Sequence, residues 1–318
     1  MKRKRVSVVM ATHNGEAWLK EQIDSVLAQT MTDFELLIGD DASSDRTYEI
    51  LEECASRDRR IRLFRHDEAL GVARNFAFLM ERARGDYLAF CDQDDRWHPQ
   101  KLERQLEVME REENGEEYAA ILVHSDLKLI DGRGRTIAPS YFRKRGYDFP
   151  ERASLPLMLT RGGVMGNTVM INRALRDAAL PFPGGLKYHD WWLGVVAELE
   201  GRRITLEEAL VEYRIHTENT SGKARWLAGE YRYPWKHRWL PWHDRDRIEA
   251  VEALLSRGIG EDQRQILERY REYLRAEKGW IRHYPSLRRA GFFDGPLSLR
   301  ARMALRLAVA SMLGKGTV

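Results

Sequence analysis

Two groups of acidic residues are the part of the sequence best suited to chemistry. One is the pair Asp40 and Asp41, the other is the segment Asp92-Gln93-Asp94-Asp95, and each group follows a short apolar run. Carboxylates crowded into one crevice repel one another and shift each other's pKa values. A bound divalent cation relieves that repulsion, and carboxylate oxygens are ligands that suit Mg²⁺ or Mn²⁺. The sequence therefore predicts a metal-dependent binding site at these acids.

Helix capping is the structural alternative for the first group. Ser44 and Asp45 offer side-chain oxygens where a helix is expected to begin, and for these two residues we favour capping. Capping is a poor explanation for the segment Asp92–Asp95, because Pro99 indicates that the next helix starts several residues later. A functional site is therefore the preferred interpretation of the second group.

The elements that must position these acids alternate along the first third of the chain. Four short, continuously apolar runs are expected to be strands: Val6–Met10, Phe34–Ile38, Ile61–Phe64 and Tyr87–Cys91. The segments between them are expected to be helices: about Glu16–Ala28, Ser43–Leu51 and Val72–Ala83. This order predicts a parallel sheet covered on both faces, whose ligands bind beyond the carboxyl ends of the strands. Both acidic groups lie at such ends.

The rest of the chain is predicted to change from mixed α/β structure to helices. Lys101–Glu112 and Trp191–Leu199 have the pattern of helices. Short strands are expected in three places: Ala119–His124, Thr168–Ile171 and Arg203–Leu206. Beyond residue 222 the pattern indicates three basic helices: Asp244–Ser256, Asp262–Trp280 and Ser298–Leu313.

Amino-acid composition and the motifs that are absent restrict the cellular compartment and the class of function that we expect. The 318 residues include two cysteines, which are too few for a disulfide framework and fit a reducing cytoplasm. No apolar run reaches the ~18 residues of a membrane span, and the basic N-terminus leads into a buried strand rather than a signal peptide. A dinucleotide, P-loop or zinc site is not expected, because the glycine-rich, H-E-x-x-H and paired C-x-x-C motifs are absent.

Several short segments, in the right order along the chain, resemble motifs of family 2 glycosyltransferases. They are Ala11–Gly15, Asp40–Asp45, Gly71–Asn75, Phe90–Trp97, Gly166–Thr168, His189–Trp192 and Tyr213–His216. The resemblance implies the GT-A fold, a Rossmann-like α/β architecture with a mixed, mainly parallel sheet flanked by helices and a helical C-terminal extension. It implies a glycosyltransferase domain over residues 1–222, with a nucleotide-binding half (1–115) and an acceptor half (116–222). A basic, Trp-rich helical region follows over 223–318.

The same resemblance implies an inverting transferase that uses Mg²⁺ or Mn²⁺. The Asp-Gln-Asp-Asp and His-Asp-Trp-Trp segments are most similar to the rhamnosyltransferase-like branch of bacterial surface polysaccharide synthesis. That similarity favours L-rhamnose from dTDP-rhamnose as donor and a glycan or lipid-linked glycan as acceptor. One alternative is a UDP-hexose-using transferase of the same family. The other is an inactive scaffold that binds carbohydrate or membrane, although such a scaffold has no need for mutually repelling carboxylates.

Roles for single residues are also implied by the resemblance. Nucleotide-sugar binding falls to Thr12, Asn14, Asp40, Asp41, Arg74, Asp92, Asp95 and Arg214. Asp40 would accept the N3–H of uracil or thymine, supported by Asp41, and Thr12 would contact the base. Arg74 would hold the base or the diphosphate. Asp92 would hold the ribose hydroxyl, with Asp95 as a helper.

The metal ligands implied by the resemblance are Asp94, Asp92 and His216. Asp94 would hold the ion that bridges the two phosphates. Two alternatives stay open at the end of the acceptor half. His216 is either a ligand or a structural hydrogen-bonding residue on a loop, and Arg214 either pairs with the diphosphate or forms an internal ion pair.

Asp190 is the residue that we expect to act as general base. Transfer with inversion requires an acceptor hydroxyl that loses its proton opposite the leaving diphosphate, and a carboxylate in an apolar pocket can take that proton. Trp191, Trp192 and Asn167 are expected to bind the acceptor. The structural alternative makes both tryptophans core anchors and Asp190 a helix cap, and both roles can coexist.

The C-terminal region differs in chemistry from the rest of the chain. Residues 223–318 hold 20 Lys and Arg against 11 Asp and Glu, and five of the nine tryptophans. Trp226–Trp242 and the amphipathic segment Ser298–Leu313 suit a peripheral contact with the cytoplasmic face of a membrane. The alternatives are a helical cap on the main domain and a homo-oligomer contact. Nucleic acid is not an expected partner, because the main domain is acidic.

Overall fold

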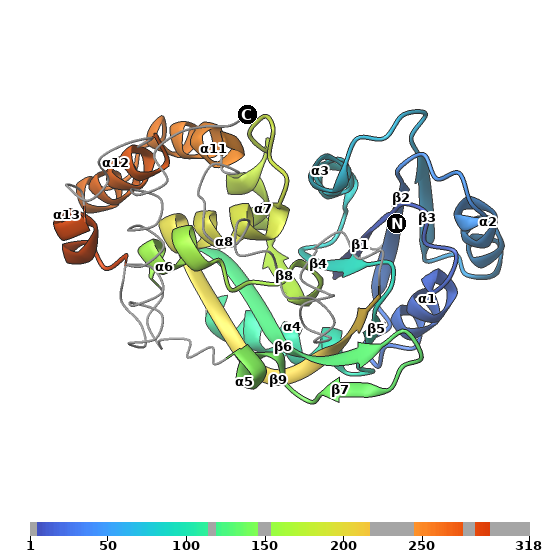
Figure 1. Ribbon diagram of the computed structural model, residues 1–318. Helices are drawn as coiled ribbons and strands as arrows, with labels where there is room; N and C mark the ends of the chain where they lie inside the picture. Colours follow the sequence, from blue (N-terminus) through green and yellow to red (C-terminus); the bar gives the residue numbers. More distant parts are fainter. Residues whose placement is uncertain (1–4, 114–118, 146–153, 217–244, 276–283, 293–318) are drawn as a thin grey trace. The chain divides into compact units, whose positions relative to one another are not determined.

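The computed structural model describes residues 5–113, 119–145, 154–216, 245–275 and 284–292 (Figure 1). The chain divides into two compact units. The first unit comprises residues 1–153, 163–182 and 187–228, and the second comprises 154–162, 183–186 and 229–318. The second unit thus includes two short segments that the sequence pattern placed in the acceptor half. The predicted helix Ser298–Leu313 and the segment Trp226–Trp242 lie outside the described residues.

The first unit begins with four parallel strands in the spatial order β3-β2-β1-β4. Their bounds are β1 Val6–Thr12, β2 Phe34–Asp40, β3 Ile61–Arg65 and β4 Tyr87–Asp92. Every residue of β2 is buried, which explains its mainly apolar sequence, and its buried Glu35 pairs with Arg62. Strand β1 pairs with β2 so that Thr12 lies opposite Asp40, and with β4 so that Ala11 lies opposite Asp92. The register therefore brings both acidic groups to one edge of the sheet.

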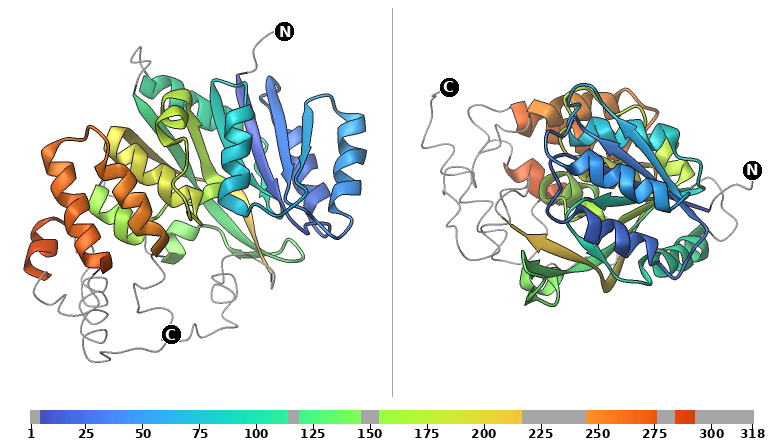
Figure 2. Two further views of the ribbon diagram at one scale, coloured as in Figure 1. Left: turned by 90° about the horizontal axis from the view of Figure 1, so that it is seen from above. Right: turned by 90° about the vertical axis from the view of Figure 1, so that its right-hand side faces the viewer.

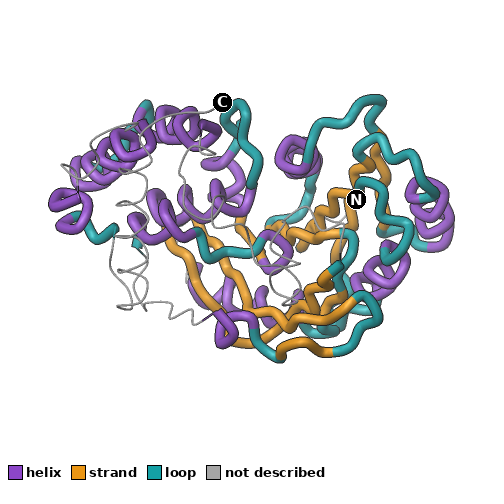
Figure 3. Tube along the Cα trace, viewed as in Figure 1, coloured by secondary structure: helices purple, strands orange, loops and turns teal. Residues whose placement is uncertain are grey.

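Helices separate these strands, as predicted (Figure 3). They are α1 Leu19–Leu27, α2 Thr47–Arg57, α3 Val72–Arg82 and α4 Lys101–Glu113. Each buries an apolar stripe, for example Leu19, Ile23 and Val26 of α1. The prediction that Ser44 and Asp45 cap α2 is met only in part. Arg46 precedes the helix and its side chain makes no capping bond, while the Asp45 carboxylate accepts Thr47 N–H at 3.0 Å and Ser44 bonds Asn14 instead.

Five further strands complete the sheet of the described chain. They are β5 Arg96–Trp97, β6 Ala120–Asp131, β7 Thr136–Ala138, β8 Val169–Asn172 and β9 Gly201–Ile215. Strand β8 lies antiparallel between β4 and β6, β9 runs parallel to β6, and β5 pairs antiparallel with β9. The sheet is thus mixed, with parallel pairing through β3-β2-β1-β4 and again between β6 and β9. This architecture confirms the predicted fold class.

Strand β9 is longer than the apolar pattern predicts. The pattern predicts a strand over Arg203–Leu206, but the strand continues to Ile215 and includes Tyr213 and Arg214. The reason is its long pairing with β6, in which Tyr213 lies opposite Leu129 and Ile215 opposite Asp131. Pairing with β5 places Glu212 opposite Arg96, directly after the acidic segment. The end of β9 therefore lies beside the acids that follow β4.

Helices and one 3-10 turn accompany these strands in the first unit. They are α5 Tyr141–Arg145, η1 Gly166–Thr168, α7 Arg173–Ala179 and α8 His189–Glu200. Helix α8 is buried along most of its length, so its sequence is apolar on all sides. Helices α7 and α8 are joined by the indole N–H of Trp192, which donates to the Ala179 carbonyl at 2.9 Å.

The described part of the second unit consists of helices (Figure 2). They are α6 Leu155–Arg161, α11 Arg245–Leu255, α12 Glu261–Arg275 and α13 Tyr284–Arg289. Tyr270 of α12 is buried, and its hydroxyl donates to the Leu159 carbonyl at 2.8 Å. Helices α11 and α12 agree with two of the three predicted basic helices. Within the described residues, every helix falls short of the length and apolar character that crossing a membrane requires.

Candidate active site

The carboxyl ends of β1 and β2 place Thr12 and Asp40 side by side. The Thr12 hydroxyl lies 3.4 Å from Asp40 Oδ1, and the Asp40 carboxylate is fully buried. Asp40 accepts a hydrogen bond from the Ser43 hydroxyl and lies 3.7 Å from the half-exposed Arg65 guanidinium. Asp40 is therefore a buried carboxylate at a strand end with partners from Thr12, Ser43 and Arg65, and its predicted contact with a base stays a prediction.

Asp41 and Asn14 hold the loops around this strand end. Asp41 accepts hydrogen bonds from the backbone N–H groups of Leu70 (2.6 Å) and Gly71 (2.9 Å), where α3 begins. Asn14 has φ 48° and accepts a bond from Ser44 N–H at 2.9 Å. These contacts favour a positioning role for both residues.

Arg74 is exposed on the first turn of α3. The start of this helix is fixed by Asp41, so the base of the Arg74 side chain is held while its guanidinium faces solvent. The placement is compatible with the predicted contact to a base or diphosphate, which stays a prediction.

Gln93 is a site residue that the sequence analysis missed. Its side-chain carbonyl accepts His13 N–H at 2.8 Å, and its side-chain N–H donates to the His13 carbonyl at 2.9 Å. A Cβ on Gly15 would lie 2.4 Å from the Gln93 amide, so a larger residue there would displace this side chain. The amide fastens the loop after β4 to the loop after β1. Its position between two aspartates is the only signal in the sequence.

Asp92, Asp94 and Asp190 form one electrostatic group. Burial, followed by the charges of Asp94 and Asp190, raises the pKa of Asp92 to about 7. Asp190 lies in the first turn of α8, nearly a hundred residues after the other two, and its carboxylate accepts Trp191 N–H at 2.7 Å. The fold thus gathers carboxylates from both halves of the first unit. This convergence is what a site for a cation and a phosphorylated ligand requires.

Asp95 lies behind this group rather than in it. The side chain is fully buried and accepts hydrogen bonds from the Asn167 side-chain amide and from Arg214 N–H. Burial, then the charges of Asp94 and Asp92, raises the pKa of Asp95 well above its usual range. This placement favours a positioning role for Asp95 and Asn167 over direct contact with donor or acceptor.

Asp94 and His216 face each other at the ends of β4 and β9. His216 Nε2 lies 2.7 Å from Asp94 Oδ2, and the His216 ring packs on Trp18 with centroids 4.1 Å apart. Among the described residues no group of three His, Cys, Asp or Glu side chains is arranged to hold a metal ion. The carboxylate suits Mn²⁺ or Mg²⁺, with further oxygens from the phosphates of a donor, while the imidazole suits a transition metal such as Mn²⁺ better than Mg²⁺.

The turn η1 packs against the start of α8. A Cβ on Gly166 would lie 2.7 Å from His189 Nε2 and 3.6 Å from Asp190 Cβ, so only glycine allows this contact. His189 is buried against the rings of Phe76 and Phe90. The Gly166–Thr168 and His189–Trp192 segments therefore form one packed unit that fixes Asp190.

Trp191 and Trp192 belong to the core. Trp191 is 5% exposed and Trp192 is fully buried. This placement favours the alternative of core anchors over stacking on an acceptor sugar. Asp190 is not the N-cap of α8, because Tyr188 holds that position and Asp190 lies in the first turn of the helix.

His189 provides a test of this packing through pH. Burial lowers the pKa of His189 to about 4, against the opposing charge of Asp190. The contribution of neutral His189 to the free energy of unfolding is fully present above its unfolded pKa of about 6.5. It falls as pH decreases towards the folded pKa, because over this range only the unfolded state protonates the imidazole. We expect His189 to account for about 2 kcal/mol of the stability lost between pH 7 and 5. Urea unfolding of the His189→Gln variant should show a correspondingly smaller loss, with exposed His98→Gln as control. Equal pH slopes for wild type and His189→Gln would contradict the assignment.

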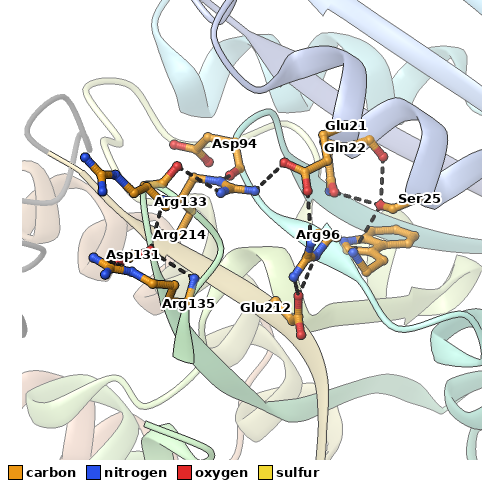
Figure 4. A network of polar contacts seen from close by, with 12 residues as sticks. Glu21, Gln22, Ser25, Asp94, Arg96, Asp131, Arg133, Arg135, Glu212 and Arg214 are labelled. Atoms are coloured by element: carbon orange, nitrogen blue, oxygen red, sulfur yellow. Dashed lines mark hydrogen bonds and ion pairs between the residues drawn. The ribbon is translucent and has the colours of Figure 1, made fainter. Parts of the chain in front are cut away.

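Arg214 is an internal cation. It is 2% exposed, its Nε donates to the Asp94 carbonyl at 2.9 Å, and its Nη2 lies 2.6 Å from Glu21 Oε2 (Figure 4). Of the two roles that the sequence left open for Arg214, this placement favours the internal ion pair.

Comparison with known proteins connects this site to a family. The sequence model of glycosyl transferase family 2 matches residues 7–177. A Bacillus subtilis protein, named as a glycosyltransferase of teichuronic acid biosynthesis, is 42% identical over 106 residues, covering 33% of this chain and 41% of that protein. An uncharacterized glycosyltransferase of Nostoc sp. is 30% identical over 224 residues, covering 68% and 66%. The chain thus matches about two fifths of the Bacillus relative's length.

Solved structures share the fold. The chain resembles Staphylococcus aureus TarS 1-349 in complex with UDP-GlcNAc, with a TM-score of 0.59 and 17% identity over 96% of this chain and 80% of that one. It also resembles the mannosyltransferase PcManGT of Pyrobaculum calidifontis in complex with GDP-Man and Mn²⁺, with a TM-score of 0.56 and 17% identity over 98% and 81%. The likeness confirms the predicted GT-A architecture.

Proposed function

Because this chain belongs to glycosyl transferase family 2, we propose that it transfers a sugar, with inversion, from a nucleoside diphosphate to a glycan or lipid-linked glycan. The observation that carries the proposal is that the fold brings Asp190, from the start of α8, to the segment of Asp92 and Asp94 after β4. Gly166 lies against Asp190, and its neighbour Asn167 bonds Asp95. Such a cluster is costly without a cation and a phosphorylated ligand, which a nucleotide-sugar transferase provides.

The proposed donor is dTDP-L-rhamnose, with a UDP-hexose as the alternative. Asp40, with Thr12 beside it, is proposed to accept the ring N–H that thymine and uracil share, so these contacts serve both donors. The choice of rhamnose rests on the similarity of the Asp-Gln-Asp-Asp and His-Asp-Trp-Trp segments to the rhamnosyltransferase-like branch of the family. The proposed product is a bacterial surface polysaccharide.

Asp190 is proposed to remove the proton from the acceptor hydroxyl as its oxygen attacks the anomeric carbon. The bond to the diphosphate breaks on the opposite face, and the nucleoside diphosphate leaves with the electron pair. Asp92 would hold the ribose hydroxyl, and Arg74 the base or diphosphate. Asp95, Asn167, Asp41 and Asn14 are proposed to keep these groups in position.

Asp94 and His216 are the residues proposed to hold Mg²⁺ or Mn²⁺, with Asp92 beside them. When bound, the cation stabilises the negative charge that develops on the leaving diphosphate. The fit rests on the Asp94–His216 pair, which lies just past the ends of β4 and β9.

The C-terminal region is proposed to bring the enzyme to its acceptor. Its basic, Trp-rich composition suits a peripheral contact with the inner face of the cytoplasmic membrane, where lipid-linked acceptors lie. A homo-oligomer contact is the second candidate. Binding to vesicles with and without anionic lipid, compared with the oligomeric state in solution, separates the two.

A thermal-shift screen tests the proposed donor class. We expect dTDP and UDP to raise the Tm only when Mn²⁺ is present, while ADP and CDP do not, because a ligand that binds the folded state stabilises it in proportion to RT ln(1 + [L]/Kd). At a hundred times Kd the expected gain is about 2.7 kcal/mol. Matched transfer assays with dTDP-rhamnose and UDP-hexoses then identify the sugar. Stabilisation by none of the diphosphates would contradict the proposal and support the inactive scaffold.

A further inference from the structure

We propose that Glu21 is a positioning residue which, through Arg214, holds Asp94 and the end of strand β9 in the arrangement that binds the metal and donor diphosphate. The inference rests on the proposed function of the Asp94–His216 pair. Glu21 lies on helix α1, outside every motif that resembles the family, and it reaches the site only through ion pairs (Figure 4).

Arg214 connects Glu21 with the acidic segment. Its guanidinium donates to the Asp94 backbone carbonyl at 2.9 Å, and its backbone N–H donates to the Asp95 carboxylate at 3.1 Å. His216, which faces Asp94, follows Arg214 by two residues. A displacement of the Arg214 side chain therefore moves both members of the Asp94–His216 pair relative to each other.

Glu21 gives this buried cation its carboxylate partner. Arg214 is 2% exposed, so its charge requires close compensation, and Glu21 Oε2 lies 2.6 Å from its Nη2. Without the Glu21 charge, the guanidinium would lose the carboxylate that holds it, and with it the orientation of its hydrogen bond to the Asp94 carbonyl. Asp94 would then be held less firmly opposite His216.

Glu21 is itself held in place by a chain of alternating charges. Its second oxygen, Oε1, lies 3.0 Å from Arg96 Nη1, and Arg96 also pairs with Glu212. Glu212 in turn accepts a bond from Lys128 Nζ at 2.8 Å. The chain connects α1, β5, β9 and β6, so the orientation of Glu21 depends on the sheet rather than on one flexible side chain.

The partial exposure of Glu21 makes the inference testable without damage to the core. Its side chain is 42% exposed, so exchange for glutamine leaves no cavity and removes only the charge. Asp24 on the same helix is the matched control, since it is 58% exposed and pairs with Lys20 away from Arg214. The two variants differ in whether the lost charge faces Arg214.

The experiment measures Mn²⁺ binding by electron paramagnetic resonance for wild type, Glu21→Gln, Glu21→Asp and Asp24→Asn. Titrations are run without nucleotide and with dTDP or UDP. We expect Glu21→Gln to weaken Mn²⁺ binding about tenfold, as loss of an outer-sphere partner does, with Asp24→Asn unchanged. Glu21→Asp should restore part of the affinity, because it retains the charge.

Kinetics provide a second readout. The Glu21→Gln variant should show lower kcat and a higher Mn²⁺ requirement, and saturating Mn²⁺ should recover most of the rate. A Glu21→Gln variant with wild-type Mn²⁺ affinity would overturn the inference while leaving the proposed function intact. Wild-type protein that binds neither Mn²⁺ nor any nucleoside diphosphate would overturn both.

Discussion

Replacement of Asp190 by asparagine is expected to lower the transfer rate by about 10³-fold, the scale of a lost general base, while donor affinity stays near that of wild type. Asparagine cannot take the proton of the acceptor hydroxyl, yet it can still accept the Trp191 N–H bond that the carboxylate accepts now. The measurements are single-turnover transfer and calorimetric titration with the donor nucleotide.

The control for this variant is Asp177→Asn. Asp177 is exposed on α7 and pairs with its neighbour Arg176, so its exchange should leave transfer unchanged. The Asp190→Asn variant should also lower the pKa of Asp92, because the Asp190 charge is one of the causes that raise it to about 7. Weakened donor affinity with normal turnover would contradict the role of Asp190.

Replacement of Asp94 by asparagine is expected to lower transfer by about 10²–10³-fold and to abolish the stabilisation by Mn²⁺ and nucleoside diphosphate. The amide has the shape of the carboxylate but lacks its charge, so a cation loses its anionic ligand beside His216. The checks are the transfer rate and the Mn²⁺-dependent change of Tm with dTDP or UDP.

Exposed Asp177 on α7 again provides the matched control, as Asp177→Asn removes the same charge from a residue that pairs with Arg176. His216→Gln should resemble Asp94→Asn if both residues hold the ion. An Asp94→Asn variant whose Mn²⁺-dependent change of Tm equals that of wild type would show that the metal is not bound at Asp94. If Asp94→Asn loses the Mn²⁺-dependent change of Tm and His216→Gln keeps it, His216 is not a metal ligand and has a structural role.

Much of the fold could be read from the sequence because its signals are local. The strands β1 to β4 are mainly apolar, with few polar residues such as Glu35 and Arg62, and the helices between them have a single apolar stripe. Parallel pairing then places the residues that follow each strand at one edge of the sheet. Thr12 opposite Asp40, and Asp92 one strand away, follow from that rule.

The second half was harder to predict because its pairing is long-range. Strand β9 has a mixed sequence, with Glu207, Glu208 and Glu212 among its residues, and it extends to Ile215 because β6 pairs with it. Partner strands about eighty residues apart leave no periodic signal in a short window. The predicted strand therefore ends at Leu206, whereas β9 continues and carries Arg214 to the acids.

Residue types alone determined that this chain concentrates carboxylates at strand ends and which segments carry them. Only the tertiary structure decided which of those polar groups face the site and which support it. Asp95, Asn167 and Arg214 look like site residues in the sequence, yet they are buried and bonded to one another, and Trp192 is enclosed in the core. The reason is physical: burial and charge pairing depend on neighbours from distant segments, such as Glu21 beside Arg214, and the sequence does not show those neighbours.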